Sequence, residues 1–461
     1  MAATRRQNTK LAAILTEAGL THSQAAALFV QVAAEAGARE FSAVARSHVS
    51  HWVAGSQPSG GAPAFLSEAL SRRLGRTVTP ENLGMTSPPR PLKDTGGWET
   101  DTLIALADLS SKGDIDVNRR QALGTAFSVA SLALPTEAWW ERAARTTRPA
   151  SGTLHVGMAD VDAVREMTGM LSRIDQRRGG AHARSAAYRY LTDDVDRLLR
   201  GRFPGENVRR AMHAAAGELA YINAWMSFDS SEHAAAQELF GVAVKLSAEA
   251  DDRPLTGHIL RAMAHQAADL GHPRHAVKIA QASMDRDRYA SACARERALL
   301  GVVHARALAA AGERRAASAA LIRAEDDLRA AEPGDDEPNR VFFFAEASLA
   351  HETARTLRDI GDYNGAAREF RRSVRTRQAS AFTRTHAVTL GYLGEVLART
   401  GRIDEASSAW SAALDAVQGV QSGRTRDVVQ QMRSAISPLR ARSPQLAKLD
   451  ARAHAYLITT A

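Results

Sequence analysis

The stretch GDYNGAAREF, residues 361–370, is one copy of a signature that recurs along the middle of the chain. A lead residue is followed five positions later by alanine, and four positions after that by a second residue that is usually bulkier. The other copies are Gly271 with Ala276 and Ala280, Gly312 with Ala317 and Leu321, Gly401 with Ala406 and Trp410, and Ser231 with Ala236 and Phe240. Successive lead residues lie 40, 41, 49 and 40 positions apart, and a fixed period of this size is typical of a helical repeat array.

The signature describes the turn and the second helix of a helix pair. Glycine ends the first helix because it adopts the left-handed cap conformation at no steric cost. The small alanine, one turn into the second helix, lets the two backbones approach, and the residue four positions later lies on the same face. The sequence therefore predicts an all-α protein in which residues 218–418 form a superhelix of helix pairs.

The sequence outside the repeats predicts further helices. The first 85 residues resemble a compact helix-turn-helix bundle, with helices at about residues 7–18, 21–36, 42–54 and 64–74 and a capping box from Thr21 and Gln24. An acidic insertion at residues 333–338 accounts for the one long spacing. We expect a helix-turn-helix-like DNA-binding domain over 1–85, a linker rich in Pro, Gly and Ser over 86–100, a helical region over 101–217, the repeats over 218–418, and capping helices over 419–461.

Composition limits the class of partner. The chain has 461 residues and a net charge of +8, which favours an acidic partner such as nucleic acid. Cys293 is the only cysteine, so an internal disulfide and a cysteine-based metal cage are excluded, and a reducing cytoplasm fits. No apolar run is long enough to span a membrane. We therefore expect a cytoplasmic protein without a membrane partner.

The third helix of the head is the best candidate for a nucleic-acid contact. Ala45, Val49, Trp52 and Val53 recur at helical spacing and are expected to face the bundle core. In a helix-turn-helix protein the opposite face enters the major groove and contacts base edges. The polar residues expected on that outward face are Arg46, Ser47, His48, Ser50 and His51. An ordinary solvated helix face is the alternative interpretation.

Basic residues elsewhere in the head are candidates for phosphate contacts. Residues 1–90 contain nine Lys and Arg against five Asp and Glu. Such residues fix the register of a protein on DNA without reading its sequence. The candidates are Arg5, Arg6, Lys10, Arg72, Arg73 and Arg76.

The sequence offers no enzymatic constellation. It contains no His-Glu-x-x-His helix, no phosphate-binding loop and no Gly-x-Ser-x-Gly elbow. His272 and His275 flank a proline, and His48 and His51 lie one helical turn apart, but neither pair has further ligands nearby. We expect no catalytic site, no metal and no cofactor.

The array is expected to bind a ligand on its concave face. That ligand would be a peptide, a partner protein or a small-molecule effector. Helix phase places on this face residues from the first helix of each pair, namely Asn223, Trp225, Arg261, His265, His304, His351 and Arg355.

Short motifs in both halves match one protein family. In the head they are HVSHW at 48–52, LSRRLGR at 70–76 and VTP at 78–80, and in the array they are LGHPR at 270–274 and PGDD at 333–336. Through these motifs the chain resembles the actinobacterial TPR-containing regulators, which join a helix-turn-helix-like segment to a C-terminal TPR array. The resemblance implies a transcriptional regulator of development or secondary metabolism.

The chain departs from that family at two positions of the head. Ser59 follows Pro58 where the family often has Arg, and His51 precedes Trp52 where the family often has Arg. Both changes remove positive charge from the expected DNA face. We therefore expect DNA binding that is weak, salt-sensitive or dependent on dimerisation.

Taken together, the sequence favours a transcriptional regulator whose head binds DNA and whose array senses an effector or mediates homodimerisation. An effector in the groove would change the spacing of two heads, and half-sites about one DNA helical turn apart would follow. The alternative is a TPR adaptor that acts through protein–protein interaction without direct DNA binding.

Overall fold

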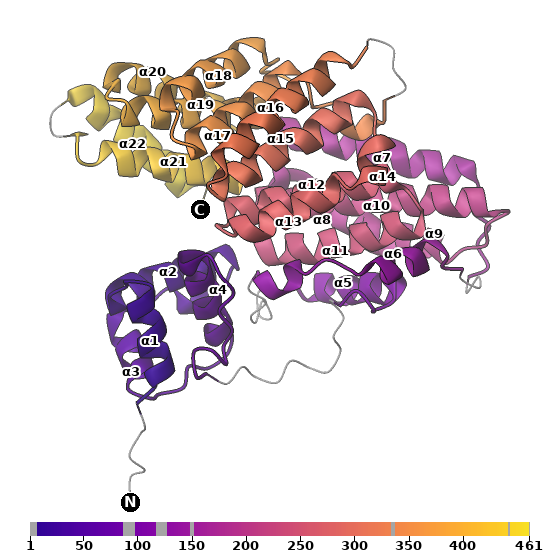
Figure 1. Ribbon diagram of the computed structural model, residues 1–461, viewed down its shortest axis with the longest axis horizontal. Coiled ribbons are helices and arrows are strands. Elements are labelled where there is room, and N and C mark those ends of the chain that lie inside the picture. The colour runs from indigo at the N-terminus through magenta and orange to yellow at the C-terminus, as the bar shows by residue number, and fades with distance from the viewer. Residues whose placement is uncertain are drawn as a thin grey trace, which may run out of the picture.

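The computed structural model describes residues 7–85, 97–116, 127–147, 152–332, 337–440 and 443–460. Arg5, Arg6, residues 86–96 of the expected linker and residues 333–336 of the acidic insertion lie outside these ranges. Within them the chain forms helices joined by turns, and an isolated parallel bridge joins His155 to Arg202. The all-α prediction is confirmed. Figure 1 shows a small helical head beside a larger curved array.

The head is built around a cluster of aromatic rings. Phe29 is fully buried, and its ring centroid lies 5.4 Å from that of Trp52 and 6.1 Å from that of Phe65. The predicted capping box is present, since Thr21 and Gln24 each accept a hydrogen bond from the backbone N–H of the other. The helices of the head are α1 (Thr9–Glu17), α2 (His22–Glu35), the 3-10 turn η1 (Arg39–Phe41), α3 (Arg46–Val53) and α4 (Ala62–Leu74).

The third helix starts later than predicted. The turn η1 takes up residues 39–41, and Ala45 has extended backbone angles, so the helical phase begins only at Arg46. Ala45 is therefore an exposed N-cap residue, and its expected place in the core was wrong. Val49 and Trp52 are buried as predicted. Ten residues separate α2 from α3, which is longer than the three- or four-residue turn typical of a helix-turn-helix motif.

Between the head and the repeats, helices cover two sides of the first repeat. Helices α5 and α6 contact α11, while α7 and α8 contact α10. Arg189 leads into a π-helical turn, Tyr190–Val195, that joins α8 to α9. The elements of this region are α5 (Thr102–Asp116), η2 (Val129–Leu132), α6 (Glu137–Ala144), α7 (Met158–Arg178), α8 (Gly180–Arg189) and α9 (Asp196–Leu199).

The repeat signature marks five helix pairs. Every lead residue lies in the turn of a pair with positive φ, including Ser231 at 64°, so a serine does adopt the left-handed conformation at the first copy. The residues five and nine positions later are buried in all five copies. The pairs are α10 (Glu206–Asp229) with α11 (His233–Glu249), α12 (Arg253–Asp269) with α13 (Pro273–Ser283), α15 (Ala294–Ala310) with α16 (Arg314–Arg329), α17 (Glu346–Asp359) with α18 (Tyr363–Thr376), and α19 (Thr383–Arg399) with α20 (Ile403–Ala416).

Three further helices complete the chain. The short α14 (Arg286–Ala290) sits between the second and third pairs, and α21 (Gly423–Ile436) and α22 (Pro444–Thr459) follow the last pair. Helix α22 packs on both α20 and α21, so it covers the end of the array. In the described ranges, none of the helices has the length and apolar character needed to cross a membrane.

Candidate functional site

The array curves until its late helices meet α7, which precedes it. Arg384 of α19 is 2% exposed and donates hydrogen bonds to Asp229 of α10, Nη1 to Oδ1 at 2.5 Å, and to Asp175 of α7, Nη2 to Oδ2 at 3.0 Å. The backbone N–H of Gln421 donates to the carbonyl of Arg178 at 2.7 Å. Because these contacts join the late helices to α7 and α10, the central part of the concave face is enclosed within the array.

A cavity of about 70 Å³ lies inside this curve. A buried water needs roughly 10–15 Å³, so the space suits a few waters or one small ligand. Side chains from α7, α10, α12, α15, α17, α19 and α21 line it, which means that most of the array contributes to one site. The wall is mainly apolar and includes Trp225, Leu299, Val303, Phe343 and Phe344.

Four of the seven residues predicted on the concave face line the cavity. They are Trp225, Arg261, His265 and His351. Trp225 and Arg261 lie against each other, with the guanidinium carbon 5.5 Å from the indole centroid. The helix phase of the repeats therefore brings together residues that are up to 126 positions apart in the sequence.

The other three predicted residues lie outside the cavity lining. Asn223 is buried and donates to the carbonyls of Ala187 and Leu219, so it joins α8 to α10. His304 is half-buried on α15 and does not reach the cavity. Arg355 lies behind the wall, where its Nη1 is 3.2 Å from His265 Nε2.

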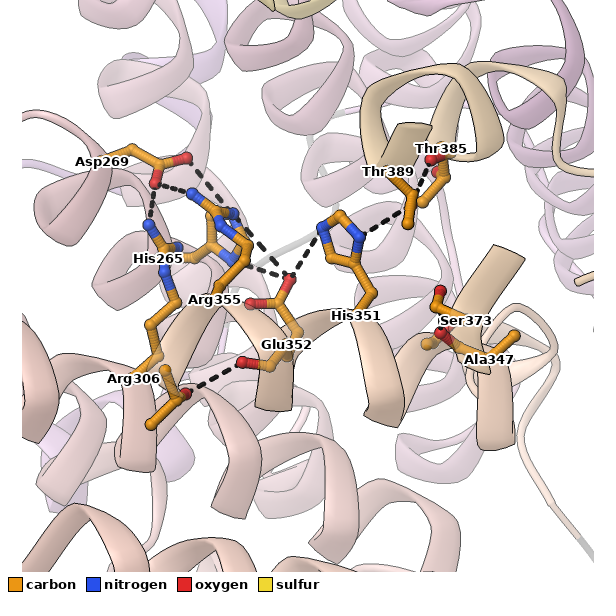
Figure 2. A network of polar contacts seen from close by, with 12 residues as sticks. His265, Asp269, Arg306, Ala347, His351, Glu352, Arg355, Ser373, Thr385 and Thr389 are labelled. Carbon is orange, nitrogen blue, oxygen red and sulfur yellow. Dashed lines mark hydrogen bonds and ion pairs between the residues drawn. The ribbon is translucent and has the colours of Figure 1, made fainter. Parts of the chain in front are cut away.

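A polar network supports the wall formed by α12 and α17 (Figure 2). Asp269 is its centre, and the carboxylate accepts hydrogen bonds from Arg306 and from Arg355. His265 Nε2 lies 3.3 Å from the same carboxylate. The pKa of Asp269 is held well below its ordinary value because these cations outweigh the effect of burial. Helices α12, α15 and α17 are thereby tied together next to the cavity.

Two histidines of the cavity are neutral near pH 7. Burial lowers the pKa of His265 to about 4, and burial also holds the pKa of His351 well below its ordinary value. His351 uses Nδ1 to contact the hydroxyl of Thr389 at 2.8 Å (Figure 2). In the part of the chain that the structure describes, no three His, Cys, Asp or Glu side chains gather as a metal site would need. Positive charge in the cavity therefore comes from arginine.

Two carboxylates also face the cavity. Burial raises the pKa of Asp175 to about 6, against the attraction of Arg384. Burial acts in the same direction on Glu352, but His265 and Arg355 outweigh it and hold the pKa of Glu352 well below its ordinary value. Glu352 is therefore ionised at neutral pH.

The cavity also contains arginines that the repeat phase did not predict. Arg377, Arg384 and Arg424 line it, and they come from the end of α18, from α19 and from α21. Arg377 and Arg424 lie outside the first helices of the repeats, to which the phase argument applied. A signal existed for Arg384, because it lies one turn before the buried Val388 and thus on an apolar face.

The outward face of α3 is largely open. Arg46, Ser47, His48 and His51 are exposed, whereas Ser50 is partly buried and contacts His22 Nδ1 through its hydroxyl at 2.9 Å. His48 Nδ1 accepts a hydrogen bond from the backbone N–H of Ala45 at 3.2 Å, which orients its ring at the start of the helix. The helix thus presents one arginine and two histidines to solvent.

The basic residues in and just after α4 form contacts within the head instead. Arg72 pairs with Glu35 at 2.6 Å and with Glu68 at 2.7 Å, and Arg76 pairs with Glu17 at 2.6 Å. Arg73 donates to the carbonyl of Ala18. Lys10 on α1 donates to the carbonyl of Glu81 at 3.3 Å. The head therefore uses much of its positive charge to hold itself together.

Comparison with known protein families finds a match in the head. A family described as the SP15 N-terminal domain matches residues 11–86, which hold most of α1 and all of α2, α3 and α4. No curated protein matches the chain. Over residues 11–86 this chain is similar to the SP15 N-terminal domain.

Proposed function

We propose that this chain is a transcriptional regulator that binds DNA through α3 and senses an effector in the interior of its helical array. The observation that supports it most is the outward face of α3, where Arg46, His48 and His51 are exposed and no acidic residue occurs between Arg46 and Val53. Arginine, histidine and serine side chains offer the donors and acceptors that read base edges in the major groove.

The rest of the molecule leaves this face accessible. Val49 and Trp52 anchor α3 to the bundle core, which fixes the direction of the opposite side chains. In Figure 1, α3 lies on the side of the head away from the array, while α4 lies towards the array. A duplex that met α3 would therefore approach the head from its free side.

The electrostatic contribution to DNA binding should be small. Because Arg72 and Arg76 are paired with Glu35, Glu68 and Glu17, they offer little uncompensated charge to phosphates. Each phosphate neutralised on B-DNA changes the slope of log K against log salt by roughly 0.9. We expect a shallow slope of about two to four and binding that is measurable mainly at low salt.

The test is binding of the full chain to a library of genomic DNA fragments at low salt, followed by fluorescence anisotropy on the selected fragments. Arg46→Ala and His51→Ala should each weaken binding to the preferred fragment by roughly 10-fold or more, as expected for base contacts worth about 1–3 kcal/mol. The matched control is Arg399→Ala, which removes an exposed arginine from the array.

Two results would count against DNA readout by α3. If the wild-type chain shows no saturable binding to DNA, the proposal is wrong, and an adaptor that acts through protein contacts alone is favoured. Binding that Arg46→Ala and Arg399→Ala weaken equally would show that α3 does not read the sequence.

A further inference from the structure

We infer that the interior cavity of the array binds a small organic monocarboxylate, with Arg261 and Arg377 as the groups that hold its carboxylate. The inference deepens the proposed function, since it names the chemical class of the effector and rests on that function for its regulatory meaning. Binding of the carboxylate to the cavity does not require that the head binds DNA.

Arg377 is a buried cation that forms no ion pair with any described residue. It directly follows α18, is 7% exposed and lines the cavity. Its Nη2 donates to the carbonyl of Ala347 at 2.9 Å and to the hydroxyl of Ser373 at 3.1 Å, while its Nε has no partner among the described residues. Burial lowers the pKa of Arg377 to about 10, and the nearby Glu352 does not offset that effect. The guanidinium is thus short of counter-charge.

Arg261, on the first helix of the second repeat, is also buried and forms no ion pair with any described residue. It is 2% exposed, and its Nη2 donates to Tyr221 Oη and contacts His258 Nε2, both at 2.9 Å. Its Nε has no partner in the described part of the chain. His258 Nδ1 lies at hydrogen-bond distance, 2.9 Å, from the carboxylate of Glu296. That carboxylate already forms an ion pair with Arg340. Arg261 therefore meets aromatic rings and neutral groups at the cavity.

The other buried arginines differ from Arg261 and Arg377 because each is paired with a carboxylate. Among the described residues, Arg209, Arg306, Arg355 and Arg384 are also buried, and every one of them has a carboxylate within 3.0 Å. Neither Arg261 nor Arg377 forms an ion pair with any described residue, although both line the same cavity. An unpaired buried charge is costly, so an anionic ligand that paired with these guanidinium groups would relieve that cost.

The surroundings select the kind of anion. The planar guanidinium fork matches a carboxylate, and the aromatic and aliphatic wall suits an apolar body attached to it. Asp175 and Glu352 also line the cavity, and Glu352 is ionised, so an anion with one negative charge is repelled less than one with two. The volume of about 70 Å³, several times what one buried water needs, restricts the ligand to a small molecule. A short-chain or small aromatic monocarboxylate meets all three conditions.

The test measures binding of butyrate and benzoate to the full chain by isothermal titration calorimetry and by the shift in melting temperature, with inorganic phosphate as the alternative anion. We expect saturable binding of at least one carboxylate. Arg377→Gln and Arg261→Gln should weaken that binding by roughly 10-fold to 100-fold, as for a lost charged hydrogen bond. The control is Arg375→Gln, an exposed arginine on the last turn of the same α18, which should bind like wild type.

A second readout separates ligand binding from a structural role. Ser373 Oγ also donates to the carbonyl of Ala347, at 2.6 Å, so that carbonyl keeps a partner when Arg377 is replaced. Without ligand, Arg377→Gln should therefore melt at or above the temperature of wild type because an unpaired charge is removed. A lower melting temperature without ligand would assign Arg377 to the fold and overturn the inference.

The remaining outcomes are equally clear. No binding of either carboxylate, or binding of phosphate alone, overturns the inference. The proposed function can fail on its own. If the chain binds benzoate through Arg377 but binds no DNA, the ligand site is supported and the role as a transcriptional regulator is rejected. A chain that binds DNA but neither carboxylate keeps the regulator and loses this site.

Discussion

His272 of the array and Glu68 of the head form a buried hydrogen bond, Nε2 to Oε1 at 2.8 Å, across the boundary between the two parts. The two side chains are 2% and 4% exposed. Phe127 stacks on the imidazole with ring centroids 5.6 Å apart and planes 18° apart, and Arg72 binds the same carboxylate from within the head. The turn between α12 and α13 thus contacts the head through the hydrogen bond from His272 to Glu68, and Phe127 packs against this contact.

Replacing His272 with Phe tests this contact. The substitution preserves a ring that can stack on Phe127 but removes the hydrogen bond to Glu68, which stays buried. We expect a loss of about 1–3 kcal/mol in the stability of the docked arrangement, together with a larger radius of gyration in X-ray scattering. The control is His275→Phe, since His275 is only partly buried and lies three residues away. An unchanged radius and melting temperature would show that other contacts dock the head.

Arg384 is expected to be the most sensitive residue of the closed array. Arg384→Met leaves Asp175 and Asp229 buried without their cation, which should lower the free energy of unfolding by about 3–5 kcal/mol. Arg399→Met on the same helix removes an exposed pair with Glu395 and a contact with the Tyr363 ring, and it should change the free energy of unfolding by less than about 1 kcal/mol. Urea denaturation measures both. Adding Asp175→Asn to Arg384→Met should recover part of the loss, and equal effects of the two single variants would contradict this role.

The repeats were predictable because their determinants are local. A left-handed turn residue, a small residue five positions later and a second apolar residue four positions after that specify one helix pair, and all five copies fold accordingly. Closure of the array has no such local determinant. It depends on Arg384 meeting acids that are 155 and 209 residues away, and no spacing rule applies over that distance.

The candidate site was predictable in part for the same reason. Helix phase assigned Arg261 and His351 to the concave face, and both line the cavity, because the first helices of the pairs repeat with a regular orientation. Asn223 obeys the same phase but is used to join α8 to α10. Arg377 escaped the phase argument because it follows the second helix of its pair. In the head, the late start of α3 moved Ala45 out of the core, since η1 occupies the preceding segment.

Two helical glycines are expected to respond in opposite directions to alanine. At Gly394 an added Cβ would lie 2.3 Å from the ring of Trp410, so Gly394→Ala should overpack the core and lower stability by about 1–3 kcal/mol. At Gly241 an added Cβ would meet nothing within 4 Å, so Gly241→Ala should raise stability by about 0.5–1 kcal/mol through helix propensity. Thermal denaturation of the two variants checks the sign. Stabilisation by Gly394→Ala would show that α20 can move away from α19.

The buried histidines of the array predict a loss of stability in mild acid. Burial lowers the pKa of His233 to about 4, of His258 to about 3 and of His265 to about 4, whereas an unfolded histidine titrates near 6.5. Between these values the unfolded chain binds protons that the folded chain does not. Stability is therefore complete above pH 6.5 and falls as the pH drops towards 4. Asp175, whose raised pKa of about 6 acts in the opposite sense between pH 4 and 6, offsets about one histidine.

His265→Gln isolates one of these contributions. Each buried neutral histidine changes the free energy of unfolding by up to about 1.4 kcal/mol per pH unit inside the window, so the variant should show a slope smaller by about that amount. Urea denaturation at half-unit intervals from pH 5 to 8 measures the slope. The exposed His454 serves as the control, and His454→Gln should leave the slope unchanged. If His265→Gln retains the wild-type slope, the acid sensitivity arises elsewhere, because a glutamine in that place cannot take up the proton that the unfolded histidine binds.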